Sequence, residues 1–435
     1  MASIIAIKKE VIEKIKPSQT ELADIENSAK NFVGLINKEL KKKRIDGNAF
    51  LGGSIAKNTL IKKEKYDIDL FVRFSKKYEN QLSSLLHKVL ENILRTKEYN
   101  RLKIEEIKGS RLYFQINLST TERKIPLILE IVPVLKINKP EEAKNVTDLS
   151  YFHVNYILKQ VKKQKNLTDE IRLAKAFCYS ADCYGAESYI KGFSGYSLEI
   201  LVSYYKTFEN FVRNVVRWKD KEIIDPEKKY KKNDALKEIN ESKLMSPAII
   251  VDPTFKERNI LAALSYETLE KFKLICIKFI KSPSENFFEK KGINEEDERK
   301  KAKKSGANLS VIEIYSDKDK EDIAAAKIIK FSSFLASLAE KSGFKVFGRD
   351  LNFSEFSGKL FLIYKNPSGE LIIKGPPENL PDAVKNFKKE HKRTFNKTGF
   401  VYAKEKRKIF NLKDLISLVG KRAKEMSINK INILK

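Results

Sequence analysis

Three carboxylates in strand-like segments carry the clearest chemistry of this sequence. Asp67 and Asp69 flank Ile68, and because side chains alternate along a strand, both carboxylates are expected on one face. Glu130 stands in a second apolar run, where a buried carboxylate is costly unless it faces a cation. Neighbouring carboxylates repel each other, and Mg²⁺ relieves that repulsion and prefers oxygen ligands. We therefore predict a magnesium site at Asp67, Asp69 and Glu130.

A glycine turn precedes the aspartate pair. Gly52 and Gly53 permit a tight turn and the close approach of a ligand, and Ser54 begins a helical segment whose free amides favour phosphate. Taken singly, the aspartate pair fits a solvated strand edge, and the glycines fit a simple turn. Their joint occurrence with a third acid on a later strand favours a nucleotidyltransferase palm. In such a palm, two metal ions serve the attacking hydroxyl and the leaving pyrophosphate.

Hydrophobic spacing predicts the elements that position these residues. Helical spacing over residues 4–43 is interrupted at Pro17 and Ser18, which predicts a helix stop followed by an N-cap. The palm then continues with a strand at 49–51, a short helical segment, a strand at 66–74, a helix at 82–95, and strands at 111–117 and 126–135. This order suits a small palm with a mixed sheet and helices.

We expect three further parts after a palm at residues 1–147. They are a mostly helical central (neck) domain at 148–280, an α+β body at 281–380 and a basic tail at 381–435. Strand-like runs at 311–315 and 359–364, with a helix at 324–342 between them, indicate the body. The predicted fold class is therefore multidomain α+β.

The charge balance indicates an acidic partner. The 435 residues include 86 Lys and Arg against 58 Asp and Glu, a formal net charge of +28. The longest apolar runs fall short of the roughly 18 residues that a membrane span requires, so no membrane association is expected. Three cysteines (Cys178, Cys183 and Cys276) cannot build a disulfide framework, which predicts a cytoplasmic protein.

The chain also resembles a known family beyond the palm. The glycine turn and acid pattern resembles the polymerase-beta superfamily of nucleotidyltransferases. Later motifs fall in the order and spacing of the archaeal class I CCA-adding enzymes: DLSYFH at 148–153, Arg172 with Lys175, YGAE at 184–187, GFSGY at 192–196, Val251-Asp252-Pro253 and Arg258-Asn259. The resemblance covers roughly residues 30 to 410. It implies Mg²⁺-dependent addition of C, C and A to the 3′ end of tRNA from CTP and ATP.

The resemblance also implies roles for single residues. Asp67, Asp69 and Glu130 would be catalytic metal ligands, with Glu130 standing where the family usually has Asp. Gly53, Ser54 and Lys57 would contact the triphosphate, with Lys57 standing where the family commonly has Arg. The remaining implied nucleotide contacts are Ser150 and His153 at the sugar and phosphates, Lys175 and Tyr184 at the triphosphate, and Arg258 at the base edge.

The C-terminal region is the predicted tRNA-binding surface. Residues 384–413 carry eleven Lys and Arg against two Glu, interleaved with aromatic residues, a pattern suited to phosphate contacts and stacking. The candidate RNA ligands are Lys392, Arg393, Lys404, Lys406, Arg407 and Lys408. In the family, this part holds the tRNA elbow, and a homodimer is compatible with the resemblance.

Two other functions compete with CCA addition. Another enzyme of the superfamily, such as a poly(A) polymerase or an oligonucleotide synthase, would share the palm, but the match at Arg258 argues against it. An inactive RNA-binding module would be expected to lose a carboxylate, and all three acids are present.

Overall fold

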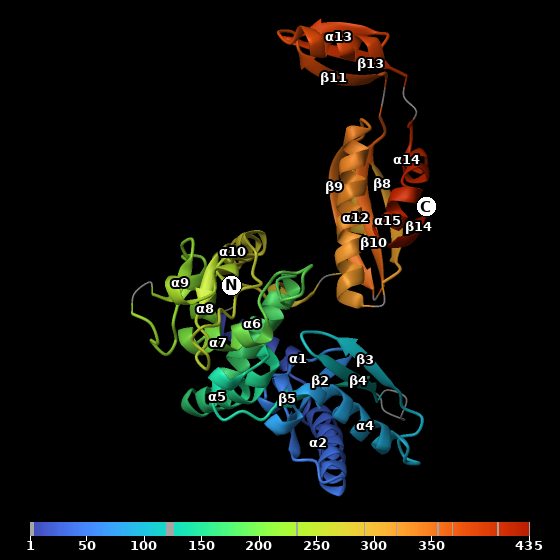
Figure 1. Ribbon diagram of the computed structural model, residues 1–435. Helices are drawn as coiled ribbons and strands as arrows, with labels where there is room; N and C mark the ends of the chain where they lie inside the picture. Colours follow the sequence, from blue (N-terminus) through green and yellow to red (C-terminus); the bar gives the residue numbers. More distant parts are fainter. Residues whose placement is uncertain are drawn as a thin grey trace. The chain divides into compact units, whose positions relative to one another are not determined.

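A computed structural model describes residues 4–118, 126–231, 234–290, 292–318, 320–354, 356–367, 369–406 and 409–434. The chain divides into two compact units, residues 1–290 and residues 291–435. Both units combine helices with strands (Figure 1).

The first unit begins with two helices and a mixed sheet. Its elements are α1 (Ile4–Ile15), α2 (Gln19–Lys42), β1 (Gly47–Leu51), α3 (Gly53–Ala56), β2 (Tyr66–Phe74), α4 (Leu82–Leu94), β3 (Ile104–Lys108), β4 (Leu112–Asn117) and β5 (Leu127–Leu135). The predicted N-cap is confirmed, because the Ser18 hydroxyl accepts from the Glu21 amide and the Glu21 carboxylate accepts from the Ser18 amide. The strand order is β1-β2-β5-β4-β3, with β2 and β5 parallel.

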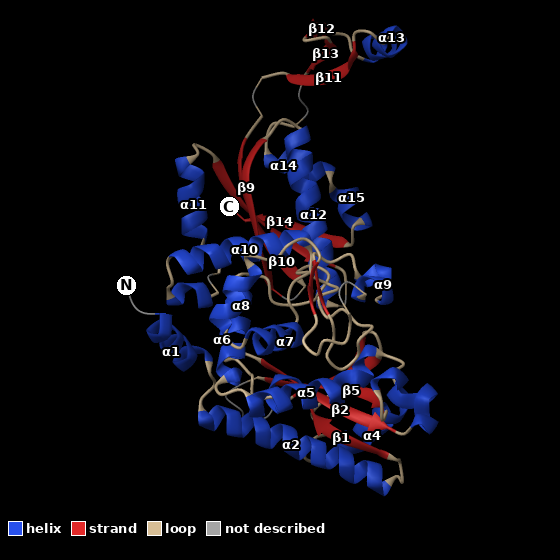
Figure 2. Cartoon of the chain, turned by 90° about the vertical axis from the view of Figure 1, so that its left-hand side faces the viewer, coloured by secondary structure: helices blue, strands red, loops and turns tan. Residues whose placement is uncertain are grey.

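One face of this sheet belongs to the hydrophobic core. Ile68 and Leu70 of β2 and Leu129 and Ile131 of β5 are buried in a cluster with apolar residues of α2 and α4. Figure 2 shows α2 running along the sheet. Burial of each such side chain stabilises the fold by about 1.5–3 kcal/mol. Because a shift of one residue would bury the acids instead, this core fixes which face Asp67 and Asp69 occupy.

A mostly helical region completes the first unit. It contains α5 (Ser150–Lys163), α6 (Leu167–Ser180), α7 (Gly195–Tyr205), α8 (Phe208–Val215), β6 (Glu222–Ile224), α9 (Ala235–Glu238), β7 (Ala248–Ile250) and α10 (Tyr266–Lys281). Its core is rich in aromatic residues, including Phe177, Phe208 and Phe272. Ile7 and Val11 of α1 also belong to this core, so the first helix of the expected palm packs with the helical region.

The described residues of the second unit form two separate sheets. The first has the order β14-β8-β10-β9 and the second β11-β13-β12. The elements of this unit are α11 (Glu295–Lys304), β8 (Asn308–Ser316), α12 (Glu321–Lys341), β9 (Lys345–Ser354), β10 (Ser357–Lys365), β11 (Leu371–Pro377), α13 (Pro381–Glu390), β12 (Thr394–Lys397), β13 (Phe400–Glu405), α14 (Leu412–Leu418), α15 (Gly420–Glu425) and β14 (Ile428–Leu434).

Strand pairing crosses the boundary expected at residue 380. β11 precedes that position but pairs with β13, which follows it. The last strand, β14, pairs with β8, and Leu415 and Val419 join the core beneath that sheet. The expected tail at 381–435 therefore contributes to both sheets of the second unit. Local spacing could not foresee this result, because pairing between distant strands leaves no mark in a short window.

Candidate active site at the acidic face of the sheet

The register of two parallel strands brings the three predicted carboxylates to one face. Asp69 of β2 lies directly opposite Glu130 of β5, and Asp67 lies two residues before Asp69 on the same side. Asp67 is exposed, whereas Asp69 and Glu130 are half-buried. The acids therefore form a negative surface that is open at Asp67.

Burial and nearby negative charge raise the pKa of two of these acids, Glu130 and Asp69. Burial, followed by repulsion from Asp69 and Asp67, raises the pKa of Glu130 to about 7, against an opposing hydrogen bond from Gln115. Burial also raises the pKa of Asp69, and the positive charge of Lys57 opposes that shift more than any other group. The ionised forms of Asp69 and Glu130 are therefore disfavoured here, and a bound cation would stabilise them.

Two further side chains on β4 lie next to the acids, and no role was predicted for them from the sequence. Gln115 lies opposite Glu130 and donates a 2.7 Å hydrogen bond from Nε2 to Oε1 of Glu130. Tyr113 lies two residues earlier on the same face. Burial raises its pKa to about 12, and the charges of Glu130, Asp69 and Asp67 add to the shift. Strand alternation would have placed both residues here, had the pairing of β4 with β5 been known.

The turn at Gly52 and Gly53 contacts Asp69 directly. Gly53 has a φ of 56°, in the left-handed region that glycine tolerates best. A Cβ at this position would lie 1.8 Å from Oδ2 of Asp69. The Gly52 amide also donates a 2.9 Å hydrogen bond to the Asp69 carbonyl. Ser54, half-buried in α3, follows at once, so the predicted turn and aspartate pair meet in space.

The donor set of this face fits a hard divalent cation. Asp67, Asp69 and Glu130 offer only carboxylate oxygens, the ligands that Mg²⁺ and similar ions prefer. Within the described ranges, no three His, Cys, Asp or Glu side chains are already gathered as a metal site. Glu130 is instead held by Gln115. The carboxylates thus lie on one face of the sheet and repel one another, but they are not already arranged as a complete set of metal ligands.

The two lysines predicted to bind the triphosphate lie together beside this face. Lys57 follows α3 and Lys175 belongs to α6, and both ammonium groups contact the buried carboxylate of Glu199 on α7. Lys175 also donates to Thr59 Oγ1 over 2.9 Å. Arg172, which is fully buried on α6, donates to the Leu60 carbonyl over 2.9 Å and so fastens the segment after α3 to the helical region.

A second polar group surrounds the buried carboxylate of Asp252. Its Oδ2 lies 3.0 Å from His153 Nε2 and 2.7 Å from Arg258 Nη1, and its Oδ1 accepts from the Tyr196 hydroxyl over 3.2 Å. The His153 ring stacks on Tyr196, with centroids 4.1 Å apart. The structure thus joins the predicted residues His153 and Arg258 through an acid that the sequence motif contained but to which no role was assigned.

The electrostatics of this group define its protonation. Burial alone would raise the pKa of Asp252, but His153 and Arg258 outweigh burial and hold that pKa well below its usual range. Burial lowers the pKa of His153, although Asp252 opposes the shift. An ionised carboxylate can only accept a hydrogen bond, so the neutral His153 ring donates through Nε2 and keeps Nδ1 as an acceptor.

Of the other two predicted nucleotide ligands, Ser150 begins a helix and Tyr184 lies between α6 and α7. Ser150 is the first residue of α5, three residues before His153. Tyr184 forms a bridge with Phe193 just before α7. A Cβ placed on Gly195 would lie 3.0 Å from the Tyr184 hydroxyl and 3.9 Å from Lys175 Cε. Tyr184 and Lys175 therefore flank the same glycine.

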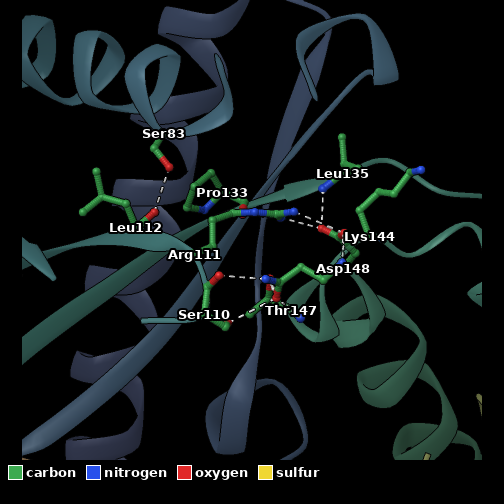
Figure 3. Close-up of polar contacts among 10 residues, drawn as sticks. Ser83, Ser110, Arg111, Leu112, Pro133, Leu135, Lys144, Thr147 and Asp148 are labelled. Atoms are coloured by element: carbon green, nitrogen blue, oxygen red, sulfur yellow. Dashed lines mark hydrogen bonds and ion pairs between the residues drawn. The ribbon is translucent and has the colours of Figure 1, made fainter. Parts of the chain in front are cut away.

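A buried ion pair fixes the start of α5 against the sheet. Figure 3 shows Arg111 directed at Asp148, with Nη1 2.6 Å from Oδ1. Arg111 also donates to the Pro133 carbonyl over 3.0 Å. Asp148 accepts from the amides of Leu135 and Lys144 over 2.8 and 3.1 Å. Because β5 carries Glu130 and α5 carries His153, this network sets the spacing between the acidic face and the Asp252 group.

Of the predicted RNA ligands, Lys404 lies on β13 of the smaller sheet, Lys392 and Arg393 directly precede β12, and Lys406 directly follows β13. Lys392, Arg393, Lys404 and Lys406 are exposed, and Arg407 and Lys408 lie outside the described residues. Arg393 pairs with Glu370 over 3.1 Å, while Lys404 Nζ lies 5.6 Å from the Phe395 ring centre. Phe395 stacks on Tyr402 across β12 and β13. Cations and aromatic rings therefore lie on and beside this sheet.

Comparisons with known proteins agree with this arrangement. The family described as "tRNA nucleotidyltransferase, second domain" matches residues 169–289, and the "Second Messenger Oligonucleotide or Dinucleotide Synthetase domain" matches residues 5–149. Two solved structures of Cid1, a poly(U) polymerase, share the fold at 13% and 12% identity, with TM-scores of 0.50 and 0.51. Each match covers 66% of this chain and 98% of Cid1. The predicted α+β nucleotidyltransferase fold is confirmed.

Curated relatives extend the match along the chain. The CCA-adding enzyme of Nanoarchaeum equitans is 35% identical over 76% of this chain and 76% of its own length. The CCA-adding enzymes of Methanocaldococcus jannaschii and Thermococcus gammatolerans are 28% and 26% identical, over 98% and 89% of this chain and 92% and 84% of their own lengths. Within the described ranges, no helix is long and apolar enough to cross a membrane. The shared length, the acidic face and the motifs that surround it together make the chain a member of the CCA-adding enzyme family.

Proposed function

We propose that this protein adds C, C and A in turn to the 3′ end of tRNA, using CTP and ATP and releasing pyrophosphate. The observation that carries the proposal is the register of β2 and β5, which sets Asp69 opposite Glu130 beside Asp67. That arrangement supports nucleotidyl transfer. The choice of tRNA is supported by the relatives, whose curated name is CCA-adding enzyme.

Asp67, Asp69 and Glu130 would hold the cofactor, which we propose to be Mg²⁺. A bound divalent cation supplies charge stabilisation to the attacking 3′ hydroxyl and to the leaving pyrophosphate. Glu130 must lose its proton to act as a ligand, and burial together with the other two acids raises its pKa to about 7. Gly53 leaves the space beside Asp69 free of a side chain, so the backbone of the turn can approach the triphosphate.

Five side chains would bind the triphosphate and the sugar. Lys57 and Lys175 would offset the negative charge of the phosphates. Burial raises the pKa of Tyr184, so its hydroxyl keeps its proton and can donate. The neutral ring of His153 offers Nδ1 as an acceptor for a sugar hydroxyl, because its Nε2–H group donates a hydrogen bond to Asp252. Ser150, on the first turn of the same helix, would assist at the sugar.

Arg258 would read the base. Its guanidinium presents only donors, and Asp252 holds it through Nη1. A donor-only group matches the acceptors on the Watson-Crick edge of cytosine and would reach adenine with help from an RNA phosphate. Selection of C and A therefore depends on where Asp252 places this side chain.

The C-terminal basic region would bind tRNA. We retain the division into a palm, a helical neck, a body and a basic tRNA-binding region, with exposed Lys392, Lys404 and Lys406 at phosphates. The free, buried thiols of Cys178, Cys183 and Cys276 suit the cytoplasm, where we place the reaction. Whether the chain acts as a homodimer is measurable by sedimentation with and without tRNA.

The direct test supplies a tRNA transcript that lacks its last three nucleotides. Purified protein, Mg²⁺ and labelled CTP and ATP, separately and together, should extend it by C, C and A and then stop. Unlimited A addition to any RNA would assign a poly(A) polymerase, and short oligonucleotides made without tRNA would assign a synthase. Asp69→Asn should abolish transfer yet leave tRNA affinity unchanged. The matched control Asp46→Asn, at an exposed acid, should retain activity.

A further inference from the structure

Glu199 is a buried acid that touches two lysines. Its side chain is 1% exposed, and its Oε2 lies 2.5 Å from Lys57 Nζ while its Oε1 lies 2.8 Å from Lys175 Nζ. The Thr59 hydroxyl donates to the same Oε1 over 3.1 Å. These contacts join the turn after α3, helix α6 and helix α7 at one carboxylate.

The charges of this group do not balance. Two ammonium groups, with side chains 8% and 3% exposed, share a single carboxylate, which leaves one positive charge in excess. An unpaired buried charge is costly, so a purely structural contact would need only one lysine. Lys57 is also the strongest positive influence on Asp69, which places the excess charge next to the acidic face.

We propose that Glu199 is a positioning residue that holds the Lys57 and Lys175 side chains together as a preformed site for the nucleoside triphosphate. The inference rests on the proposed function, in which these lysines meet the phosphates. An incoming triphosphate supplies the negative charge that the group lacks. Tyr184 and Lys175 flank Gly195, so a hydroxyl donor lies beside the same site.

The electrostatics explain why a partner is needed. Burial lowers the pKa of Lys175, and Glu199 is the main opposing influence. The positive charges of Lys57 and Arg172 lower the pKa of Lys175 further. The acid near both lysines on β2 is Asp69, whose own pKa these two charges lower. Burial alone would raise the pKa of Glu199, but the two ammonium groups lower it to about 2. Without Glu199, Lys175 would lose its proton at lower pH.

The test measures CTP binding by the full chain in EDTA at pH 7 and pH 9. Glu199→Gln should raise the Kd for CTP about tenfold at pH 7 and further at pH 9, whereas the wild type changes little. In turnover assays with Mg²⁺, the KM for CTP should rise while the KM for tRNA stays constant. Glu209→Gln, which removes a half-buried carboxylate on α8 that pairs with Arg213, is the control and should match the wild type.

A second pair of variants guards against misfolding. Lys57→Gln with Glu199→Gln keeps the net charge of the group, and it is compared with Lys57→Gln alone. Loss of CTP binding from pH 7 to pH 9 only in the double variant would support the positioning role. Identical profiles in these two variants would overturn it, as would a Glu199→Gln variant with wild-type Kd at both pH values.

The outcomes also separate this inference from the proposed function. Wild-type CTP binding that depends on Glu199, without any transfer to tRNA, would support the positioning role and refute CCA addition alone. CCA addition by the wild type, together with unchanged CTP binding in Glu199→Gln, would refute the positioning role alone.

Discussion

Arg258 Nη1 lies 2.7 Å from Oδ2 of Asp252, and the same oxygen lies 3.0 Å from His153 Nε2. One carboxylate thereby orients both the side chain assigned to the base and the side chain assigned to the sugar. Asp252 is fully buried and also accepts from the Thr254 amide and hydroxyl, so its own position is fixed by the turn that carries it. In the proposed function, base recognition and sugar recognition would consequently be coupled through a single acid.

Asp252→Asn should therefore impair CTP and ATP use together. The Asn amide is neutral and has one acceptor oxygen in place of two, so it cannot accept hydrogen bonds from both Arg258 and His153 as the carboxylate does. Both side chains should therefore lose their orientation. We expect kcat/KM to fall about 10- to 100-fold for each nucleotide, equivalent to roughly 1.4–2.8 kcal/mol of transition-state stabilisation. Single-nucleotide addition to tRNA ending before CCA, and to tRNA ending in CC, measures this effect.

Arg258→Lys is the informative companion to that variant. It keeps the charge but not the planar fork, so discrimination against UTP and GTP should weaken while Asp252 stays paired. Equal losses for CTP and ATP in Asp252→Asn agree with the coupling. A loss confined to one nucleotide would contradict it.

Glu130 gives a pH dependence with a defined sign. Its pKa is raised from 4.5 to about 7, so the folded state binds a proton that the unfolded state has released between these values. Stability conferred by Glu130 is therefore complete below about pH 4.5 and is lost as the pH rises through 7, by at most about 3 kcal/mol. Glu130→Gln should remove this component.

Metal-free unfolding of the wild type and of Glu130→Gln from pH 5 to pH 8 tests this sign. The stability of the variant relative to the wild type should increase with pH. Comparison with the variant is essential, because the lowered pKa of His153 acts in the opposite direction near pH 6.5. A difference that does not change across this range would refute the assignment.

Alanine substitutions at two glycines, Gly53 in the turn and Gly34 in α2, should have opposite effects on stability. Gly53→Ala forces a Cβ against Asp69 Oδ2 at a φ of 56°, so we expect at least tenfold lower kcat/KM (about 1.4 kcal/mol) and a lower Tm. Gly34→Ala, on the exposed side of α2 with no atom within 4 Å of the added Cβ, should instead stabilise the helix by about 1 kcal/mol. Full activity in Gly53→Ala would exclude the close approach of this turn to the substrate.

Much of the palm is legible in the sequence, because its cues are local. Ser18 caps α2, and the strand predicted at 66–74 is β2 with the same bounds. The face of Asp67 and Asp69 follows from alternation alone. β3 was missed, since its residues Ile104–Lys108 include Glu105 and Glu106 and show little apolar character.

The supporting residues of the site were not predictable from local patterns. Glu199 lies within an apolar helical run, where a lone acid predicts nothing until α7 is seen beside α6. Gln115 acquires its role only through the pairing of β4 with β5. The assignment of residues 411–435 likewise depended on β14 joining β8, a contact between segments more than a hundred residues apart.

The basic sheet of the second unit should bind tRNA through phosphates. Replacing Lys392, Lys404 and Lys406 with Gln removes three exposed cations, so fewer counterions would be released on binding. The slope of log Kd against log salt should decrease by about 2 to 3 if each lysine meets one phosphate. The kcat for CTP with saturating tRNA should remain unchanged, because these residues lie outside the acidic face.

The matched control removes Lys41, Lys42 and Lys43, which are exposed at the C-terminal end of α2. Both triple variants lower the net charge equally, so a general effect of charge would change both slopes alike. A change confined to the first variant locates phosphate contacts on the sheet β11-β13-β12. An unchanged slope in that variant, with an unchanged Kd, would instead place the tRNA contacts on other basic residues.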